Sequence, residues 1–71
     1  MNSGLVMWQE MEGKFVFRFQ TDEKNVHRNM AMMKGFKMVG KGVNCDLWIY
    51  RVEFSSVENA KKTLEILVSK R

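Results

Sequence analysis

Two stretches near the start of the chain are rich in apolar residues, as β-strands are, and the second alternates in the pattern of a half-buried strand. The first covers residues 5–11, and the second covers residues 14–20, where three phenylalanines recur at every second position. Glu12 and Gly13 separate the two stretches, and a glycine supplies the positive φ angle that a tight hairpin turn requires. The pattern therefore predicts an N-terminal β-hairpin with a two-residue turn.

A helical period of apolar residues follows the hairpin. Thr21 is an expected N-cap, and Val26, Met30 and Met33 recur at the spacing of one helix face. Gly35 marks the expected end of this helix, because glycine is the usual residue just after a helix C-terminus.

The second half of the chain repeats the order of the first half. A short strand over residues 36–39, a glycine-rich loop over residues 40–44 and a long strand over residues 45–54 predict a second hairpin. Ser55 with Glu58 three residues later matches a capping box at the start of a second helix. The apolar stripe of this helix comprises Val57, Ala60, Leu64, Leu67 and Val68.

The predicted order is ββαββα in one small α+β domain covering residues 1–71. A right-handed crossover through the first helix makes the third strand parallel to the second, and the second hairpin can place the fourth strand between them. We therefore expect a four-stranded, antiparallel-type mixed sheet of order 1-2-4-3 with two helices on one face, a permuted ferredoxin-like fold. A different strand order, or exchange of one ββα unit between chains, remains an alternative.

Pairing across the two predicted hairpins assigns the aromatic side chains to one face of the sheet. A two-residue turn places Trp8 opposite Phe17, and a five-residue loop places Phe36 opposite Trp48. All eight aromatic residues then lie on the face that the helices cover, because so much aromatic surface would not stay in water. The opposite face remains open and is expected to be half apolar and rich in basic residues.

This open face predicts a surface for binding a protein, since a solvated sheet face is normally more polar. We expect a non-enzymatic interaction module, such as a small regulator or inhibitor of the kind that mobile genetic elements encode. It would mask or bridge a macromolecular partner and form a homodimer through the open face or an edge strand. The predicted interface residues are Leu5, Met7, Met11, Val16, Arg18, Val39, Leu47, Ile49 and Arg51.

Charge gives an alternative hypothesis. The chain has 12 Lys and Arg against 8 Asp and Glu, and most of the resulting +4 charge lies in residues 21–44. Basic side chains contact phosphates without reading sequence, so this segment could belong to a nucleic-acid-binding module. With every aromatic residue assigned to the core, the segment lacks stacking partners, and a solvated surface that aids solubility is the simpler explanation of its charge. The phosphate contacts would come from Lys24, Arg28, Lys34, Lys37 and Lys41.

The fourth strand and second helix resemble part of the RNA-recognition motif. Residues 51–54, followed by Ser55 and an amphipathic helix containing Ala60, are similar to the end of the third strand and the second helix of that family. Ile49 and Arg51 occupy the positions of its exposed stacking aromatics. The resemblance therefore covers the strand-to-helix pattern of ferredoxin-like folds and not the residues that bind RNA.

The remaining residues predict no enzyme, metal site, cofactor or small-molecule substrate. Cys45 and His27 are the only residues of their types, and His27 is expected on the outer side of the first helix, beyond hydrogen-bond reach of Cys45. The lone cysteine allows no internal disulfide and is expected to pack as a small hydrophobe. No apolar run is long enough for a membrane span or a signal peptide, so we expect a cytoplasmic protein.

Overall fold

The computed structural model describes residues 4–70, which form four strands and two helices. In chain order these elements are β1 (Leu5–Gln9), β2 (Val16–Thr21), α1 (Lys24–Met32), β3 (Lys37–Lys41), β4 (Trp48–Glu53) and α2 (Val57–Ser69). The strands form one sheet of order β1-β2-β4-β3, and every neighbouring pair is antiparallel. The predicted α+β fold, element order and strand order are confirmed.

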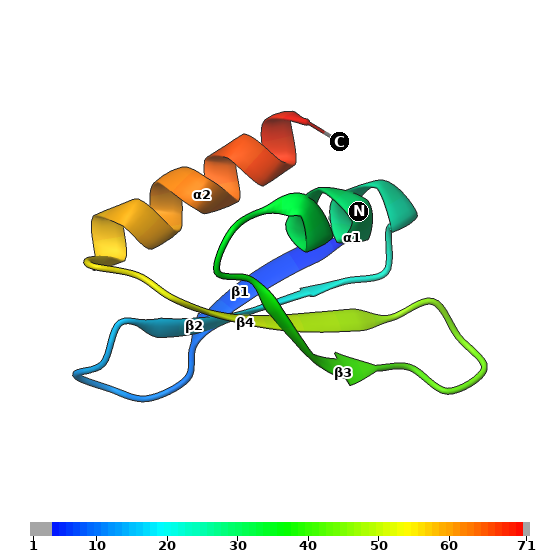
Figure 1. The fold of residues 1–71 in the computed structure, drawn as a ribbon, viewed down its shortest axis with the longest axis horizontal. Coiled ribbons are helices and arrows are strands. Elements are labelled where there is room, and N and C mark those ends of the chain that lie inside the picture. Colours follow the sequence, from blue (N-terminus) through cyan, green and yellow to red (C-terminus); the bar gives the residue numbers. More distant parts are fainter. Residues whose placement is uncertain (1–3, 71) are drawn as a thin grey trace.

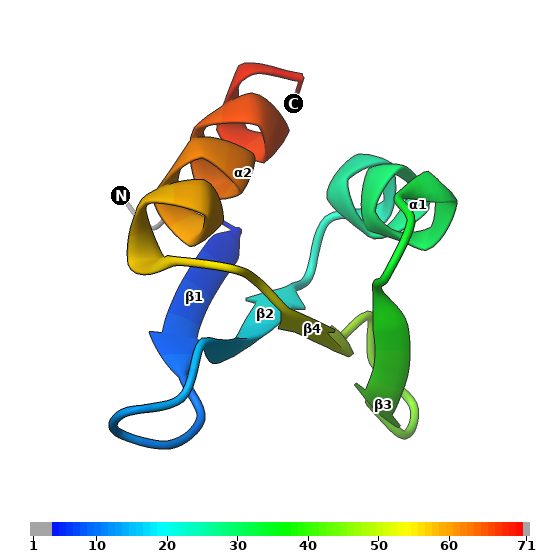
Figure 2. The same ribbon diagram turned by 60° about the vertical axis from the view of Figure 1, so that its left-hand side comes forward.

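Both helices lie on the same face of the sheet (Figure 1). Turning the molecule shows α2 on the side of β1 and α1 on the side of β3, with the other face of the sheet free of helices (Figure 2). In the part of the chain that the structure describes, neither helix is long and apolar enough to cross a membrane.

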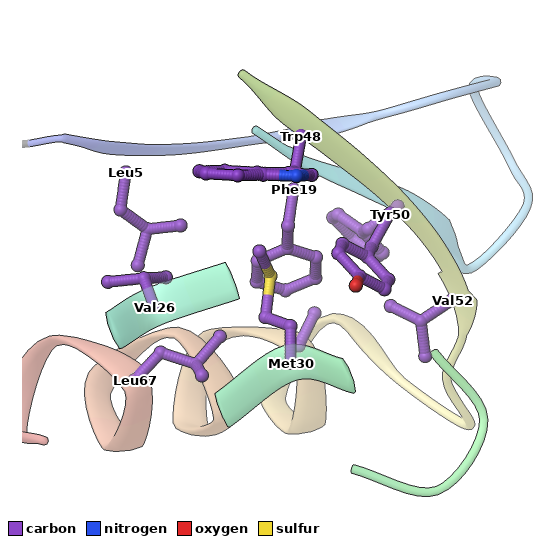
Figure 3. Close-up of a cluster of buried hydrophobic side chains, with 10 residues drawn as sticks. Leu5, Phe19, Val26, Met30, Trp48, Tyr50, Val52 and Leu67 are labelled. Carbon is purple, nitrogen blue, oxygen red and sulfur yellow. The ribbon is translucent and has the colours of Figure 1, made fainter. Parts of the chain in front are cut away.

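The hydrophobic core fills the space between the sheet and the helices (Figure 3). Phe19 on β2 is fully buried, and its ring lies 5.2 Å from that of Phe36 and 6.2 Å from that of Phe54, measured between centroids. Met30 from α1 and Leu67 from α2 are also fully buried. The predicted stripe of α2 is confirmed at Ala60 and Leu67, whereas Val57 and Val68 at its margins are exposed.

The first hairpin has a longer turn than predicted. The N–H of Glu10 donates to the C=O of Val16 at 2.8 Å, so five residues separate this pair instead of two. Gly13 has the expected positive φ of 83°. The N–H of Lys14 donates to the C=O of Met11 at 3.2 Å, which closes the turn, and Phe15 then adds one more residue before β2 begins. This shifts the strand register by one residue, which turns every side chain of β1 to the opposite face of the sheet.

The shift overturns two predictions about β1. Leu5 and Met7 do not lie on the open face: Leu5 is 5% exposed in the core, and Met7 packs against the core from the same side. Trp8 takes their place on the open face, where it pairs with Arg18 of β2. Trp8 therefore shows that the eight aromatic residues do not all share the helix-covered face, and Phe15 is exposed just before β2 begins.

The second hairpin differs in its pairing but not in the orientation of β4. Trp48 and Tyr50 are buried beneath the helices as predicted, because alternation within β4 alone decides their side. Lys41 pairs with Trp48, and β3 contains a bulge at Val39. Residues 42–47 form the loop, so Cys45 is exposed instead of packing as a small hydrophobe.

Both helices begin one or more residues later than predicted. Thr21 is not the N-cap of α1; it ends β2, and its buried hydroxyl accepts a hydrogen bond from the N–H of Glu23 at 3.0 Å. The N-cap of α2 is Ser56 instead of Ser55, and its Oγ accepts a hydrogen bond from the N–H of Asn59 at 3.2 Å. At α2 the neighbouring hydroxyl caps the helix equally well, so sequence alone does not choose between Ser55 and Ser56, whereas the N-cap of α1 is Glu23 and makes no side-chain capping bond.

Candidate binding site on the open sheet face

One row of side chains crosses all four strands on the open face. The strand registers place Trp8 beside Arg18, Arg18 beside Arg51, and Arg51 beside Lys37. Adjacent strands lie about 4.8 Å apart, so the row extends about 14 Å from β1 to β3. We call these four residues the cross-strand row.

Glu10 holds the two arginines of this row together. Its Oε2 accepts a hydrogen bond from Nε of Arg18 at 2.7 Å, and both of its carboxylate oxygens lie 3.1 Å from Nε of Arg51. The hydrogen bond from Arg18 is the main reason that the pKa of Glu10 lies below its ordinary value, although partial burial opposes this shift. The bridge therefore orients both guanidinium groups across β2 and β4.

The bridge leaves most of the arginine hydrogen-bond donors available. A guanidinium group has five N–H donors, and Glu10 is bonded only to the Nε atoms of Arg18 and Arg51. Within residues 4–70, their terminal nitrogens donate no hydrogen bond. These paired N–H groups match the geometry of phosphate and carboxylate oxygens, so the row can bind an anionic ligand.

The residues around the cross-strand row include both apolar and charged side chains. Val6, next to Trp8 along β1, is 54% exposed, and Trp8 itself is 39% exposed. Ile49 is half-buried, and it lies beside Gly40 of β3. Glu53 follows Arg51 on the same face of β4 and is exposed. The open face is therefore less apolar than predicted, and its large aromatic surface lies next to arginine.

The structure divides the nine predicted interface residues into three groups. Val16, Arg18, Ile49 and Arg51 lie on the open face as predicted. Met11 lies in the first turn, Val39 at the bulge and Leu47 in the second loop, so these three lie at its margins. Leu5 and Met7 lie in and against the core.

The five predicted phosphate-binding residues do not share one surface. Lys37 joins the cross-strand row, whereas Lys24 and Arg28 are exposed on α1, and Lys34 lies in the turn after it. Lys41 pairs with Trp48, which places it on the helix side of β3. Sequence reasoning missed Trp8 and Glu10 as members of a site, since the face of β1 depends on the number of residues in the first turn.

A second polar cluster lies on the helix side of the sheet. The ring of His27 stacks on that of Trp48, with centroids 4.2 Å apart and planes 7° from parallel, and its Nδ1 shares a hydrogen bond of 3.0 Å with the hydroxyl of Tyr50. The prediction that His27 faces outward is wrong, because α1 lies close enough to β4 for this ring to cover Trp48. Burial lowers the pKa of His27, the charges of Lys41 and Arg28 lower it further, and burial raises the pKa of Tyr50.

Acidification should destabilise the fold through His27. Its folded pKa is lower than the ordinary value of 6.5, so the unfolded chain binds more protons between the two values. The free energy of unfolding should therefore rise with pH through this window and level off above it. Urea unfolding measured from about pH 5 to about pH 7.5 should show the rise in the native chain and a flatter profile in His27→Gln. An equal rise in both chains would contradict this assignment.

Among the described residues, no group of three or more His, Cys, Asp or Glu side chains is placed to hold a metal ion. Comparisons of the chain with protein-family models, with curated proteins and with solved structures found no match.

Proposed function

We propose that this chain is a non-enzymatic binding module whose open sheet face binds single-stranded nucleic acid. The observation that carries the proposal is the cross-strand row, in which Trp8 lies next to Arg18, with Arg51 and Lys37 beyond it. Proteins that bind single strands without sequence preference combine a basic surface, which follows the phosphates, with aromatic rings on which bases stack. The row offers both in adjacent positions.

The register of the first hairpin supports a nucleic acid over a purely apolar partner. It removes Leu5 and Met7 from the open face and replaces them with the partly exposed indole of Trp8. The terminal N–H groups of Arg18 and Arg51 suit phosphate oxygens, and the net charge of +4 favours the approach of a polyanion. The ligand is single-stranded because only unpaired bases can lie flat on an aromatic ring.

We place this activity in the cytoplasm. Cys45 is a free and exposed thiol, and a reducing compartment keeps such a group from oxidising.

Removing the two guanidinium groups should weaken binding and also reduce its dependence on salt. In Arg18→Gln/Arg51→Gln, two phosphate contacts are lost. The slope of log affinity against log salt should therefore become shallower by about 1.4, at roughly 0.7 per phosphate for a single strand. Fluorescence anisotropy with labelled oligo(dT) and oligo(U) of about 15 nucleotides measures both quantities.

The matched control removes the same charge from the helix layer. Lys61→Gln/Lys62→Gln changes two exposed residues of α2 and should keep nearly the native affinity and slope. The proposal fails if the native chain binds neither oligonucleotide at low salt. It also fails if the two double variants lose affinity equally.

Docking of a protein on the same face is a second candidate function, favoured by the exposed Val6 and the half-buried Ile49 beside the cross-strand row. In this role the chain would mask or bridge its partner as a regulator or inhibitor. Its first test is self-association through the face, which Ile49→Glu should abolish in sedimentation experiments if the face is the contact. Two results together would argue against this second function. The native chain would show no self-association through the face, and Ile49→Glu would leave oligonucleotide binding intact.

A further inference from the structure

The two edges of the sheet differ in how well they are protected against pairing with another strand. The β3 edge carries Lys37, Lys41 and the bulge at Val39, and charged residues and bulges are the devices that keep natural sheet edges apart. The β1 edge is a regular strand of five residues without a charge, a proline or a bulge. We propose that two copies of this chain join by antiparallel pairing of their β1 strands, which creates one continuous eight-stranded sheet.

The hydrogen bonds of the first hairpin show which main-chain groups are available for this pairing. The N–H of Glu10 donates to the C=O of Val16, which makes the even-numbered positions of β1 the ones that bond to β2. The N–H and C=O groups of Met7 and Gln9 therefore point away from β2. In residues 4–70 no other strand lies beside β1 on that side.

These groups and two-fold symmetry determine the register. The available main-chain groups belong to Met7 and Gln9, and the two-fold pairing that uses all of them places Met7 opposite Gln9 of the second copy, twice by symmetry. The same register places Trp8 opposite Trp8 of the second copy on the open face. Two aromatic residues directly opposite each other form a favourable cross-strand pair, and Trp8 is 39% exposed in the single chain.

Charge also favours this edge over the other. Each copy carries a net charge of +4, so contacts between basic surfaces would repel. All five residues of β1 are uncharged, and the seam brings no like charges together.

The second copy would extend the nucleic-acid site described above. The two Trp8 rings would lie opposite each other at the seam and join the two cross-strand rows into one, so the continuous surface would be about twice as long as that of one copy. This lengthening of the site rests on the proposed function, whereas the pairing of the two β1 strands does not depend on it.

Sedimentation equilibrium of the full chain without nucleic acid tests the pairing. Gln9→Pro removes an N–H that points away from β2, and proline is tolerated in an edge strand at such a position. The native chain should form a dimer, and its dissociation constant should rise by at least about tenfold in this variant. The matched control is Gln9→Ser, which also loses the bond from Gln9 Nε2 to the C=O of Lys14 but keeps the N–H, and it should remain dimeric.

Amide hydrogen exchange gives a second test that does not depend on a variant. Exchange at Met7 should slow as the protein concentration is raised through the dimer range, since its N–H becomes bonded only in the dimer. A chain that stays monomeric at millimolar concentration overturns the proposal, as does a dimer that Gln9→Pro leaves intact. Unchanged exchange at Met7 in a proven dimer also overturns it. Failure of oligonucleotide binding leaves all three of these results unaffected, so the two proposals can fail separately.

Discussion

Replacing Phe19 with alanine is expected to remove a large part of the stability of the fold. Phe19 lies on β2, is fully buried, and contacts the rings of Phe36 and Phe54. Truncating a buried phenylalanine to alanine costs about 3–5 kcal/mol, because the apolar contacts are lost and a cavity remains. A domain of 71 residues has a total stability of roughly 4–10 kcal/mol, so this one change removes a large part of it.

Circular dichroism during urea unfolding measures the effect. The matched control is Phe15→Ala, because Phe15 is 43% exposed and precedes β2, and it should lose about 1 kcal/mol or less. Similar losses in both variants would contradict the placement of Phe19 at the centre of the core.

Replacing Trp8 with alanine is expected to abolish most of the affinity for a single-stranded oligonucleotide. One stacked base contributes about 1–3 kcal/mol, which corresponds to a roughly 5- to 150-fold weaker affinity when the ring is removed. The fold should tolerate the change, because Trp8 lies on the open face and not in the core. The salt dependence should stay unchanged, since no phosphate contact is lost.

Trp8→Phe separates stacking from other effects. It keeps an aromatic face at the same position and should lose less affinity than Trp8→Ala in the same anisotropy measurement. An Ala variant that binds as tightly as the native chain would contradict the stacking role. A Phe variant as weak as the Ala variant would also contradict it.

The sequence predicted the face of a side chain correctly where the pattern within a single strand was enough to determine it. The alternation within β2 and β4 correctly assigned Phe17, Phe19, Trp48 and Tyr50 to the helix side, because each strand contains its own pattern. β1 has apolar residues at four consecutive positions, 5–8, and so has no pattern that favours one face. Its orientation then depended on the length of the turn, which the position of Gly13 did not reveal.

The residues of the candidate site were likewise predictable only where one strand determines its own orientation. Arg18 and Arg51 were placed on the open face correctly, since β2 and β4 determine their own orientation. Trp8 and Glu10 were missed because both depend on the first turn. The bridge from Glu10 to Arg51 joins residues 41 apart in the chain, and no local pattern indicates such a contact.

The position of β4 between β2 and β3 also bears on how the chain folds as it is synthesised. The first hairpin can form early, but the inner edge of β2 has no partner until residues 48–53 have emerged. Until then the aromatic side of β2 is uncovered and its edge can pair with a foreign strand, which is the usual origin of aggregation in nascent chains. Closure of the sheet is therefore a late, long-range event, and contacts of this kind slow folding more than local ones do.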